Sequence, residues 1–173
     1  STYSLLEDGT VIAGTDHTIT GIADASSDSN GAFANSSITS IILPSTIEKI
    51  GDYAFYNCDS LTSVTFGDNS QLTSIGDSAF KNCTSLTNIT IPESVTSIGN
   101  RAFYDCRGLT EINFNATNMS DLKSYYSVFS NAGRDSTGIT VNIGENVQRI
   151  PAYLFYSNTT YEFPQITTVN FLG

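Results

Sequence analysis

The stretch that decides the fold is Ile50-Gly-Asp-Tyr-Ala54-Phe55-Tyr-Asn-Cys58-Asp-Ser-Leu61-Thr-Ser-Val64-Thr-Phe66. The same pattern returns at Ile75 to Ile91 and at Ile98 to Phe114. Across the chain six phenylalanines each follow an apolar residue, at spacings of 22, 25, 23, 26 and 26: Phe33, Phe55, Phe80, Phe103, Phe129 and Phe155. A repeat of about 20–29 residues is typical of leucine-rich repeats, in which one unit cannot bury its own apolar face.

Each unit also contains two apolar steps. The first fits the strand pattern L-x-x-L-x-L, as in Leu86-Thr-Asn-Ile89-Thr-Ile91. The second is apolar-x-x-apolar, as in Leu72/Ile75, and a corner glycine such as Gly76 follows it, where a sharp change of direction carries no steric cost. The sequence therefore predicts a leucine-rich-repeat solenoid of about six coils, a right-handed and mainly β superhelix. Each coil would have a short helical or 3₁₀ turn at its phenylalanine.

These residues resemble the BspA-like leucine-rich repeats of bacterial and some protist surface proteins. The resemblance covers roughly residues 32–171 and rests on the signature from Ile50 to Phe66 and its two returns. It implies an extracellular adhesion or recognition module. The family has no shared catalytic residues, so the resemblance implies a class of protein and no site.

Two segments depart from the repeat. Residues 1–31 lack it, and Asp8-Gly9 predicts a hairpin that caps the first coil, leaving residues 32–173 as the repeat domain. At 115–127, the stretch from Met119 to Tyr126 predicts an irregular, helical insertion in place of a short strand. The chain stops just after a predicted strand that carries no polar cap. We therefore expect either that the natural chain continues or that another molecule covers this end.

The charge of the chain restricts its partners. The formal net charge is −10, which repels phosphate backbones and makes nucleic acid an unfavourable partner. No apolar run approaches the roughly 18 residues that a membrane span needs, so no membrane insertion is expected in this segment. Polarity comes mainly from Ser, Thr and Asn, which is usual in secreted or surface-exposed β-rich proteins. An extracellular or cell-surface location is expected.

Residues that could carry chemistry have structural explanations. Cys58, Cys83 and Cys106 all lie three positions after a repeat phenylalanine, and their spacing is not that of a zinc site. Buried packing is the favoured interpretation, against metal or redox chemistry. The residue before that slot is Asn35, Asn57, Asn82, Asp105 or Asn131, which predicts a ladder of turn-closing side chains.

Catalysis has little support in the sequence. His17 is the single histidine and lies in the segment without repeats. We predict no enzyme activity, no metal and no cofactor. Asn115-Ala-Thr, Asn118-Met-Ser and Asn158-Thr-Thr match the glycosylation sequon and suit a sugar better than Asn35 or Asn82, whose sequons fall in the ladder.

Two surfaces are candidates for binding. In L-x-x-L-x-L the intervening residues face outward and form a face rich in hydroxyls and amides, with these candidate ligand-binding residues: Thr65, Thr87, Asn88, Thr90, Glu111 and Asn113. The alternative is that they only solubilise an exposed sheet. Tyr125 and Tyr126 form the second candidate, because the repeat does not explain them; packing along the coil edge is the alternative.

The leading hypothesis is a non-catalytic recognition or adhesion module that binds a host or community protein or a glycan. The alternative is a passive structural spacer within a larger surface protein. We expect either a monomer or end-to-end association through the C-terminal coil.

Overall fold

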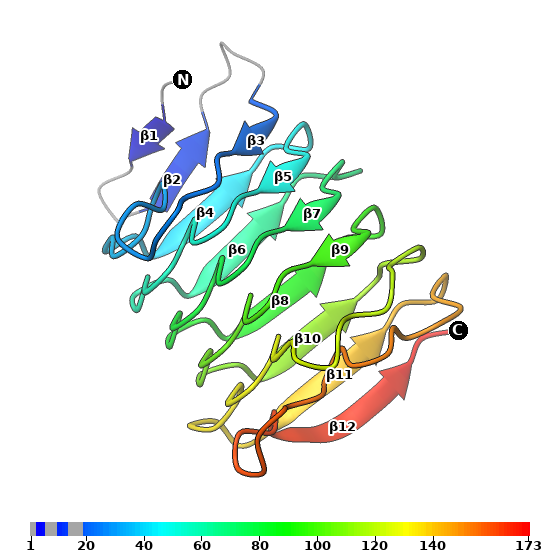
Figure 1. The fold of residues 1–173 in the computed structure, drawn as a ribbon. Coiled ribbons are helices and arrows are strands. Elements are labelled where there is room, and N and C mark those ends of the chain that lie inside the picture. Colours follow the sequence, from blue (N-terminus) through cyan, green and yellow to red (C-terminus); the bar gives the residue numbers. More distant parts are fainter. Residues whose placement is uncertain (1–2, 6–9, 14–18) are drawn as a thin grey trace.

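The computed structural model describes residues 3–5, 10–13 and 19–173, which stack as successive coils of a β-solenoid (Figure 1). Its long strands are β1 (Tyr3–Leu5), β2 (Thr10–Ala13), β4 (Ser40–Leu43), β6 (Ser63–Phe66), β8 (Asn88–Ile91), β10 (Glu111–Phe114), β11 (Ile139–Ile143) and β12 (Ile166–Phe171). Its short strands are β3 (Gly21–Ile22), β5 (Lys49–Ile50), β7 (Ser74–Ile75) and β9 (Ser97–Ile98). The predicted solenoid of about six coils is confirmed.

The strands form two walls. One wall consists of two four-stranded sheets, β1-β2-β4-β6 and β8-β10-β11-β12, and the other is the sheet β3-β5-β7-β9 (Figure 1). All pairs are parallel except β1 with β2. Between β6 and β8 the Thr87 amide donates to the Thr62 carbonyl at 3.4 Å, which links the two parts of the long wall.

The repeat phenylalanines stack in one column inside the solenoid. Successive ring centroids lie 5.2, 5.0, 5.3, 5.1 and 5.5 Å apart, and the first five rings are parallel to within 7°. These spacings follow the roughly 4.8 Å separation of paired strands, so each ring packs on the ring of the next coil in an offset stack. The rings of Phe55, Phe80, Phe103 and Phe129 are fully buried. The column explains why the aromatic residue recurs once in each coil.

The segment that carries the phenylalanine is not the predicted helical turn. No helix is present among the described residues. In the second coil Tyr53 and Asn57 flank Phe55 with φ of 57° and 56°, a left-handed conformation that interrupts a helix. The amides of Tyr53, Phe55 and Asn57 donate to the carbonyls of Asp77, Ala79 and Lys81 in the next coil. The turn is therefore a third line of contact between coils.

Residues 115–127 contain no helix, so the helical part of that prediction is wrong; they contain no strand either. Met119 and Leu122 are buried and continue the apolar-x-x-apolar step made by Val95 and Ile98 in the previous coil. Residues 115–127 therefore depart less from the repeat pattern than the sequence indicated. Seven positions separate Leu122 from Phe129, whereas five separate Ile98 from Phe103. Two extra residues therefore enlarge the loop at Tyr125 and Tyr126.

An acidic ladder runs along the corner after the short strands. Asp24 Oδ1 accepts from the Asp52 amide at 3.0 Å, Asp52 Oδ1 from the Asp77 amide at 2.7 Å, and Asp77 Oδ1 from the Asn100 amide at 2.7 Å. Partial burial raises the pKa of the Asp52 carboxyl above its ordinary value, against the hydrogen bond from Asp77, which lowers it. Lys49 pairs with Asp24 and lowers the pKa of that carboxyl.

The two ends of the solenoid differ. At the N-terminal end β1 pairs antiparallel with β2, and β2 pairs with β4. The predicted Asp8-Gly9 turn and His17 lie outside the described residues, and the capping role and domain boundary at 31 remain predictions. At the C-terminal end β12 is an edge strand on which Val169 and Phe171 are 48% and 72% exposed. Among the described residues no helix is long and apolar enough to cross a membrane.

Candidate recognition surfaces

The outer face of the long wall carries the predicted polar positions. Thr65, Thr87 and Asn88 are exposed, and Thr90, Glu111 and Asn113 are partly buried. The Thr87 hydroxyl lies 3.5 Å from the Thr62 carbonyl, and the Thr87 carbonyl accepts from the Thr110 hydroxyl at 3.1 Å. Thr87 therefore belongs to a threonine ladder at the start of the strands. Thr65 and Thr90 make no side-chain hydrogen bond within the described part of the chain, so their hydroxyls are available to a partner.

An ordered amide row crosses β10, β11 and β12. Asn113 Nδ2 donates to Glu111 Oε1 at 2.8 Å, Asn142 Nδ2 to Asn113 Oδ1 at 2.9 Å, and Asn170 Nδ2 to Asn142 Oδ1 at 2.9 Å. Parallel pairing in register places Asn113 opposite Asn142 and Asn142 opposite Asn170. Glu111 and Asn113 are therefore brought together as predicted site residues. We call Glu111, Asn113, Asn142 and Asn170 the amide row.

Tyr125 and Tyr126 lie elsewhere on the molecule. Their rings meet edge to face with centroids 5.2 Å apart, and Tyr125 is 54% exposed. The Lys123 ammonium lies 5.6 Å from the centroid of the Tyr125 ring, a cation–π distance. Tyr126 is partly buried and lines hollows of about 310 and 140 Å³ beside β7 and β9. The tyrosine pair and the amide row are therefore separate surfaces.

The cysteines are buried in one column, in agreement with the packing interpretation. The Cys58, Cys83 and Cys106 thiols donate to the carbonyls of Phe33, Phe55 and Phe80 at 3.1, 3.2 and 3.2 Å. Burial raises the pKa of all three thiols, which disfavours the reactive thiolate. Within the described ranges, no three His, Cys, Asp or Glu side chains gather in a group that could hold a metal.

The asparagine ladder is structural. Asn35, Asn57, Asn82, Asp105 and Asn131 all have φ between 56° and 63°, the left-handed region that Asn and Asp tolerate best. Asn57 Nδ2 donates to Asn35 Oδ1 at 3.0 Å. Of the favoured sequon positions, Asn118 is exposed, Asn158 accepts a hydrogen bond from the Ser127 hydroxyl, and Asn115 is partly buried.

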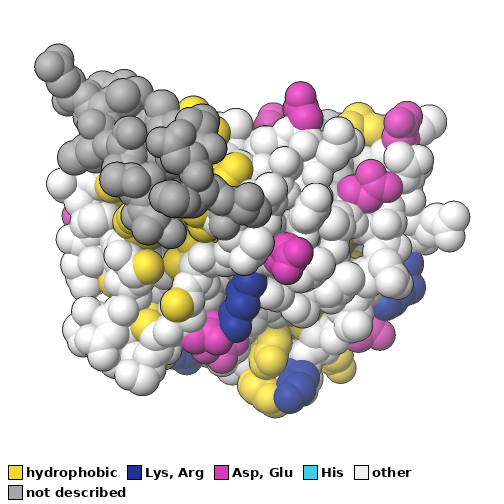
Figure 2. All heavy atoms as spheres, turned by 90° about the horizontal axis from the view of Figure 1, so that it is seen from above, with side chains coloured by type: hydrophobic (Ala, Val, Ile, Leu, Met, Phe, Trp, Pro, Cys, Tyr) yellow, Lys and Arg dark blue, Asp and Glu magenta, His cyan; other side chains and the backbone are white. Residues whose placement is uncertain are grey.

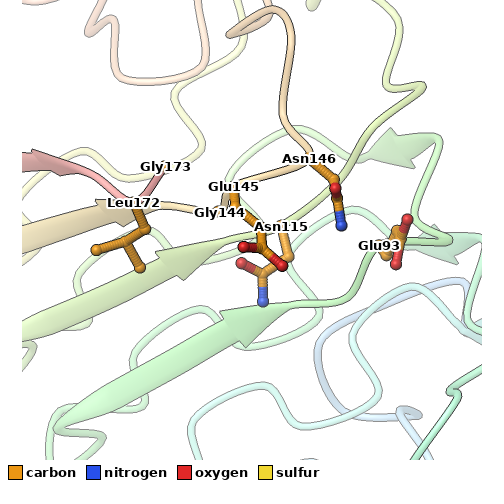
Figure 3. A pocket seen from close by; sticks show the side chains of 7 residues that line it. All are labelled: Glu93, Asn115, Gly144, Glu145, Asn146, Leu172 and Gly173. Atoms are coloured by element: carbon orange, nitrogen blue, oxygen red, sulfur yellow. The ribbon is translucent and has the colours of Figure 1, made fainter.

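Sequence reasoning missed a groove beside the turns that follow the long strands. One hollow of about 590 Å³ is lined by Glu93, Asn115, Gly144, Glu145, Asn146 and the C-terminal residues (Figure 3). A second hollow of about 550 Å³ adjoins it and shares Glu93, with Phe66, Thr90 and Pro92 in its lining. We call the two hollows together the turn groove. No local signal marks it, because its residues come from different coils and their types vary.

The surface charge is sparse and mainly negative. Figure 2 shows one face, on which acidic side chains are scattered among uncharged ones and Lys or Arg side chains are few. Lysine and arginine are absent from the described residues that line the two hollows of the turn groove. An anionic ligand would therefore meet no compensating charge there.

Comparison with known proteins supports the same architecture. The family model described as "BspA type Leucine rich repeat region" matches residues 27–162 in six copies. The crystal structure of the pneumococcal vaccine antigen PcpA is 21% identical with a TM-score of 0.56, covering 87% of this chain and 35% of that one. The T. pallidum leucine-rich-repeat protein is 20% identical with a TM-score of 0.51, covering 94% of this chain and 87% of that one.

At these identities the likeness to solved structures shows the fold alone. This chain spans about a third of the pneumococcal antigen's chain. A comparison with curated protein sequences gave no match.

Proposed function

We propose, because this chain belongs to the BspA-type leucine-rich-repeat family, that it is a non-catalytic recognition module at the cell surface or outside the cell. Its partner would be a host or community protein or a glycan, bound through the outer face of the long wall. Membership of this family supports a surface location. An extended face of stacked repeats is a frequent recognition surface in solenoids.

The observation that carries this proposal is the amide row. Its carboxamides are held in register by hydrogen bonds of 2.8–2.9 Å, and each terminal group keeps donor or acceptor capacity toward solvent. Side chains that are already ordered lose less entropy when a partner binds. Thr65 and Thr90 extend the same face with hydroxyls that the fold does not use. The face is therefore suited to a polar, flat partner.

A binding screen with matched variants tests the proposal. Purified protein would be measured by biosensor against plasma and extracellular-matrix glycoproteins. We expect Glu111→Ala with Asn113→Ala to weaken binding at least about tenfold, the effect of losing a charged hydrogen-bonding group at an interface. Tyr125→Ala with Tyr126→Ala tests the second surface. Gln148→Ala, at an exposed position outside the amide row and the tyrosine pair, is the control.

A passive spacer is the second candidate, and the continuous phenylalanine column favours it because such a core gives a stiff rod. A spacer would bind no probe and would tolerate every substitution on the outer face without loss of adhesion by cells that display it. Loss of adhesion in the Glu111→Ala, Asn113→Ala variant with an unchanged thermal transition would exclude the spacer.

The association state belongs to the same proposal. Either the chain is monomeric or it associates end to end through β12, where Val169 and Phe171 are exposed. Sedimentation of the protein and of its Phe171→Ser variant distinguishes the two, since end-to-end contact through this edge requires the apolar side chain.

A further inference from the structure

The turn groove follows the stacking direction of the coils. Its lining begins at the end of β6 with Phe66 and passes Thr90 and Pro92 at β8, Asn115 after β10, and Gly144 after β11. These turns are successive along the solenoid (Figure 1). From β6 to β12 there are four steps of about 4.8 Å, so the groove is about 19 Å long. It is long enough for a chain-like ligand and too long for one small sugar or ion.

The floor of the turn groove is rigid. The amides of Gly67, Asn115 and Gly144 donate to the carbonyls of Leu43, Ile91 and Phe114 at 2.9, 3.0 and 2.9 Å. Strand pairing thus continues into the turns, and these backbone groups are already used. An extended peptide that adds as a strand needs free backbone donors and acceptors, and these three amides are not available to it.

The walls of the groove carry polar side chains that the fold does not use. Glu93, Asn115, Glu145 and Asn146 make no side-chain hydrogen bond within the described residues, in contrast to the amide row. Figure 3 shows the carboxamide of Asn115 beside Glu145, in the hollow that both line. Gly144 admits that carboxamide, since a Cβ there would lie 2.5 Å from Asn115 Oδ1. Two carboxylates and two carboxamides therefore line one hollow with their hydrogen-bonding capacity free.

The carboxylates and carboxamides of the turn groove indicate the chemical class of its ligand. Adjacent carboxylate and carboxamide groups accept and donate hydrogen bonds in the pattern that neighbouring sugar hydroxyls complete. Phe66, which is only partly buried at the end of β6, supplies an apolar surface for the C–H face of a ring. The two carboxylates and the absence of lining cations oppose sulfated, phosphorylated or sialylated chains.

We propose that the turn groove binds a neutral oligosaccharide laid along the coils, with Glu93, Asn115, Glu145 and Asn146 as its hydrogen-bonding partners. This inference rests on the proposed recognition function and names a ligand class at the turn groove, which adjoins the outer face of the long wall at Thr90.

The test uses the whole chain on an array of neutral oligosaccharides built from hexoses, pentoses and N-acetylhexosamines. The strongest binder is then titrated by calorimetry beside a heparin-derived hexasaccharide and hexalysine. We expect saturable binding of a neutral chain of four or more units, and none of the heparin fragment. Asn115→Ala and Glu145→Ala each lower the affinity at least tenfold, and Gln148→Ala leaves it unchanged. Circular dichroism spectra and thermal transitions confirm that each variant is folded.

Three results would overturn the inference: no neutral chain binds, a neutral chain binds equally well to Asn115→Ala and Glu145→Ala, or hexalysine competes for the groove. The glycoprotein screen separates these results from failure of the recognition function. Binding there that depends on Glu111 and Asn113 keeps the proposed function while the saccharide site is lost. If no binding is found in either experiment, both the recognition function and the saccharide site are excluded.

Discussion

At the residue scale, close approach between coils explains the corner glycines. A Cβ added to Gly76 would lie 2.5 Å from the Asp52 amide nitrogen and 2.6 Å from the Gly51 carbonyl carbon of the preceding coil. Gly51 and Gly99 meet the backbones of Ala23 and Asp77 in the same way. These glycines are required because neighbouring backbones touch, and a positive φ is not the reason. The sequence suggested that the corner glycines allow the chain to change direction, and this is only part of their role.

Gly76→Ala is therefore expected to destabilise the fold by about 1–3 kcal/mol or more, as overpacking against backbone does. Gly21→Ala is the matched control, because among the described residues its Cβ would meet nothing closer than 3.6 Å. That change is expected to be neutral or stabilising by up to about 1 kcal/mol through the unfolded state. Urea denaturation of both variants measures the difference, and equal midpoints would contradict the close-approach explanation.

The three thiols give a second prediction at this scale. Burial raises the pKa of each thiol in the folded chain above its unfolded value. The unfolded state then loses these protons first as pH rises, so stability is fully present below about pH 8.5 and falls above it. Alkylation with iodoacetamide at pH 8 is expected to be slow in the native protein and fast in urea. Rapid native labelling of Cys83 or Cys106 would show that the column is accessible.

At the scale of elements, each coil contributes one ring to a shared aromatic column. Phe80 packs between Phe55 and Phe103, with centroid distances of 5.0 and 5.3 Å. Phe80→Ala is expected to cost about 3–5 kcal/mol, because it removes a buried ring and leaves a cavity inside the column. The control Phe163→Ala changes a half-exposed ring and should cost less than about 1 kcal/mol. Urea denaturation compares them, and a small effect at Phe80 would mean that the column does not carry the core.

Polar side chains that hold neighbouring coils together differ from those that a binding partner could use. Threonine hydroxyls, cysteine thiols and the acidic corner all bond to backbone of a neighbouring coil. In the turn groove, by contrast, the Glu93 and Glu145 side chains make no hydrogen bond to any other part of the chain that the structure describes. A repeated polar side chain that bonds to the backbone of a neighbouring coil is therefore a poor guide to binding in this protein. The amide row bonds side chain to side chain, and the turn positions Glu93 and Glu145 make no side-chain hydrogen bond among the described residues.

At the scale of the whole molecule, stability is expected to vary along the solenoid. Coils contact only their neighbours, so a central strand is held on two sides and β12 on one. Amide hydrogen exchange should be slowest at β10 and β11, which pair on both sides, and at least about tenfold faster at β12. Exchange measured by mass spectrometry on peptides covering 111–114 and 166–171 tests this. Equal protection at both would indicate that the edge is covered in solution.

Local sequence determined most of the architecture. The coil length, the number of coils and the inward residues follow from apolar periodicity, because one period of Phe, Leu and Ile positions fills one coil. The cysteine column and the asparagine ladder were also predictable, since each recurs at a fixed distance from the phenylalanine. Sequence indicated the outer face of the long wall as well, including Glu111 and Asn113.

Only the stacked structure decided the remaining features. The left-handed turns at Tyr53 and Asn57 replace the expected helical turn because their amides pair with the next coil, a partner that no local pattern specifies. Glu93 and Glu145 are 52 positions apart and share a hollow only because the coils are in register. Apolar periodicity fixes what each coil buries, whereas the surface groups that meet across coils depend on the length of every turn between them.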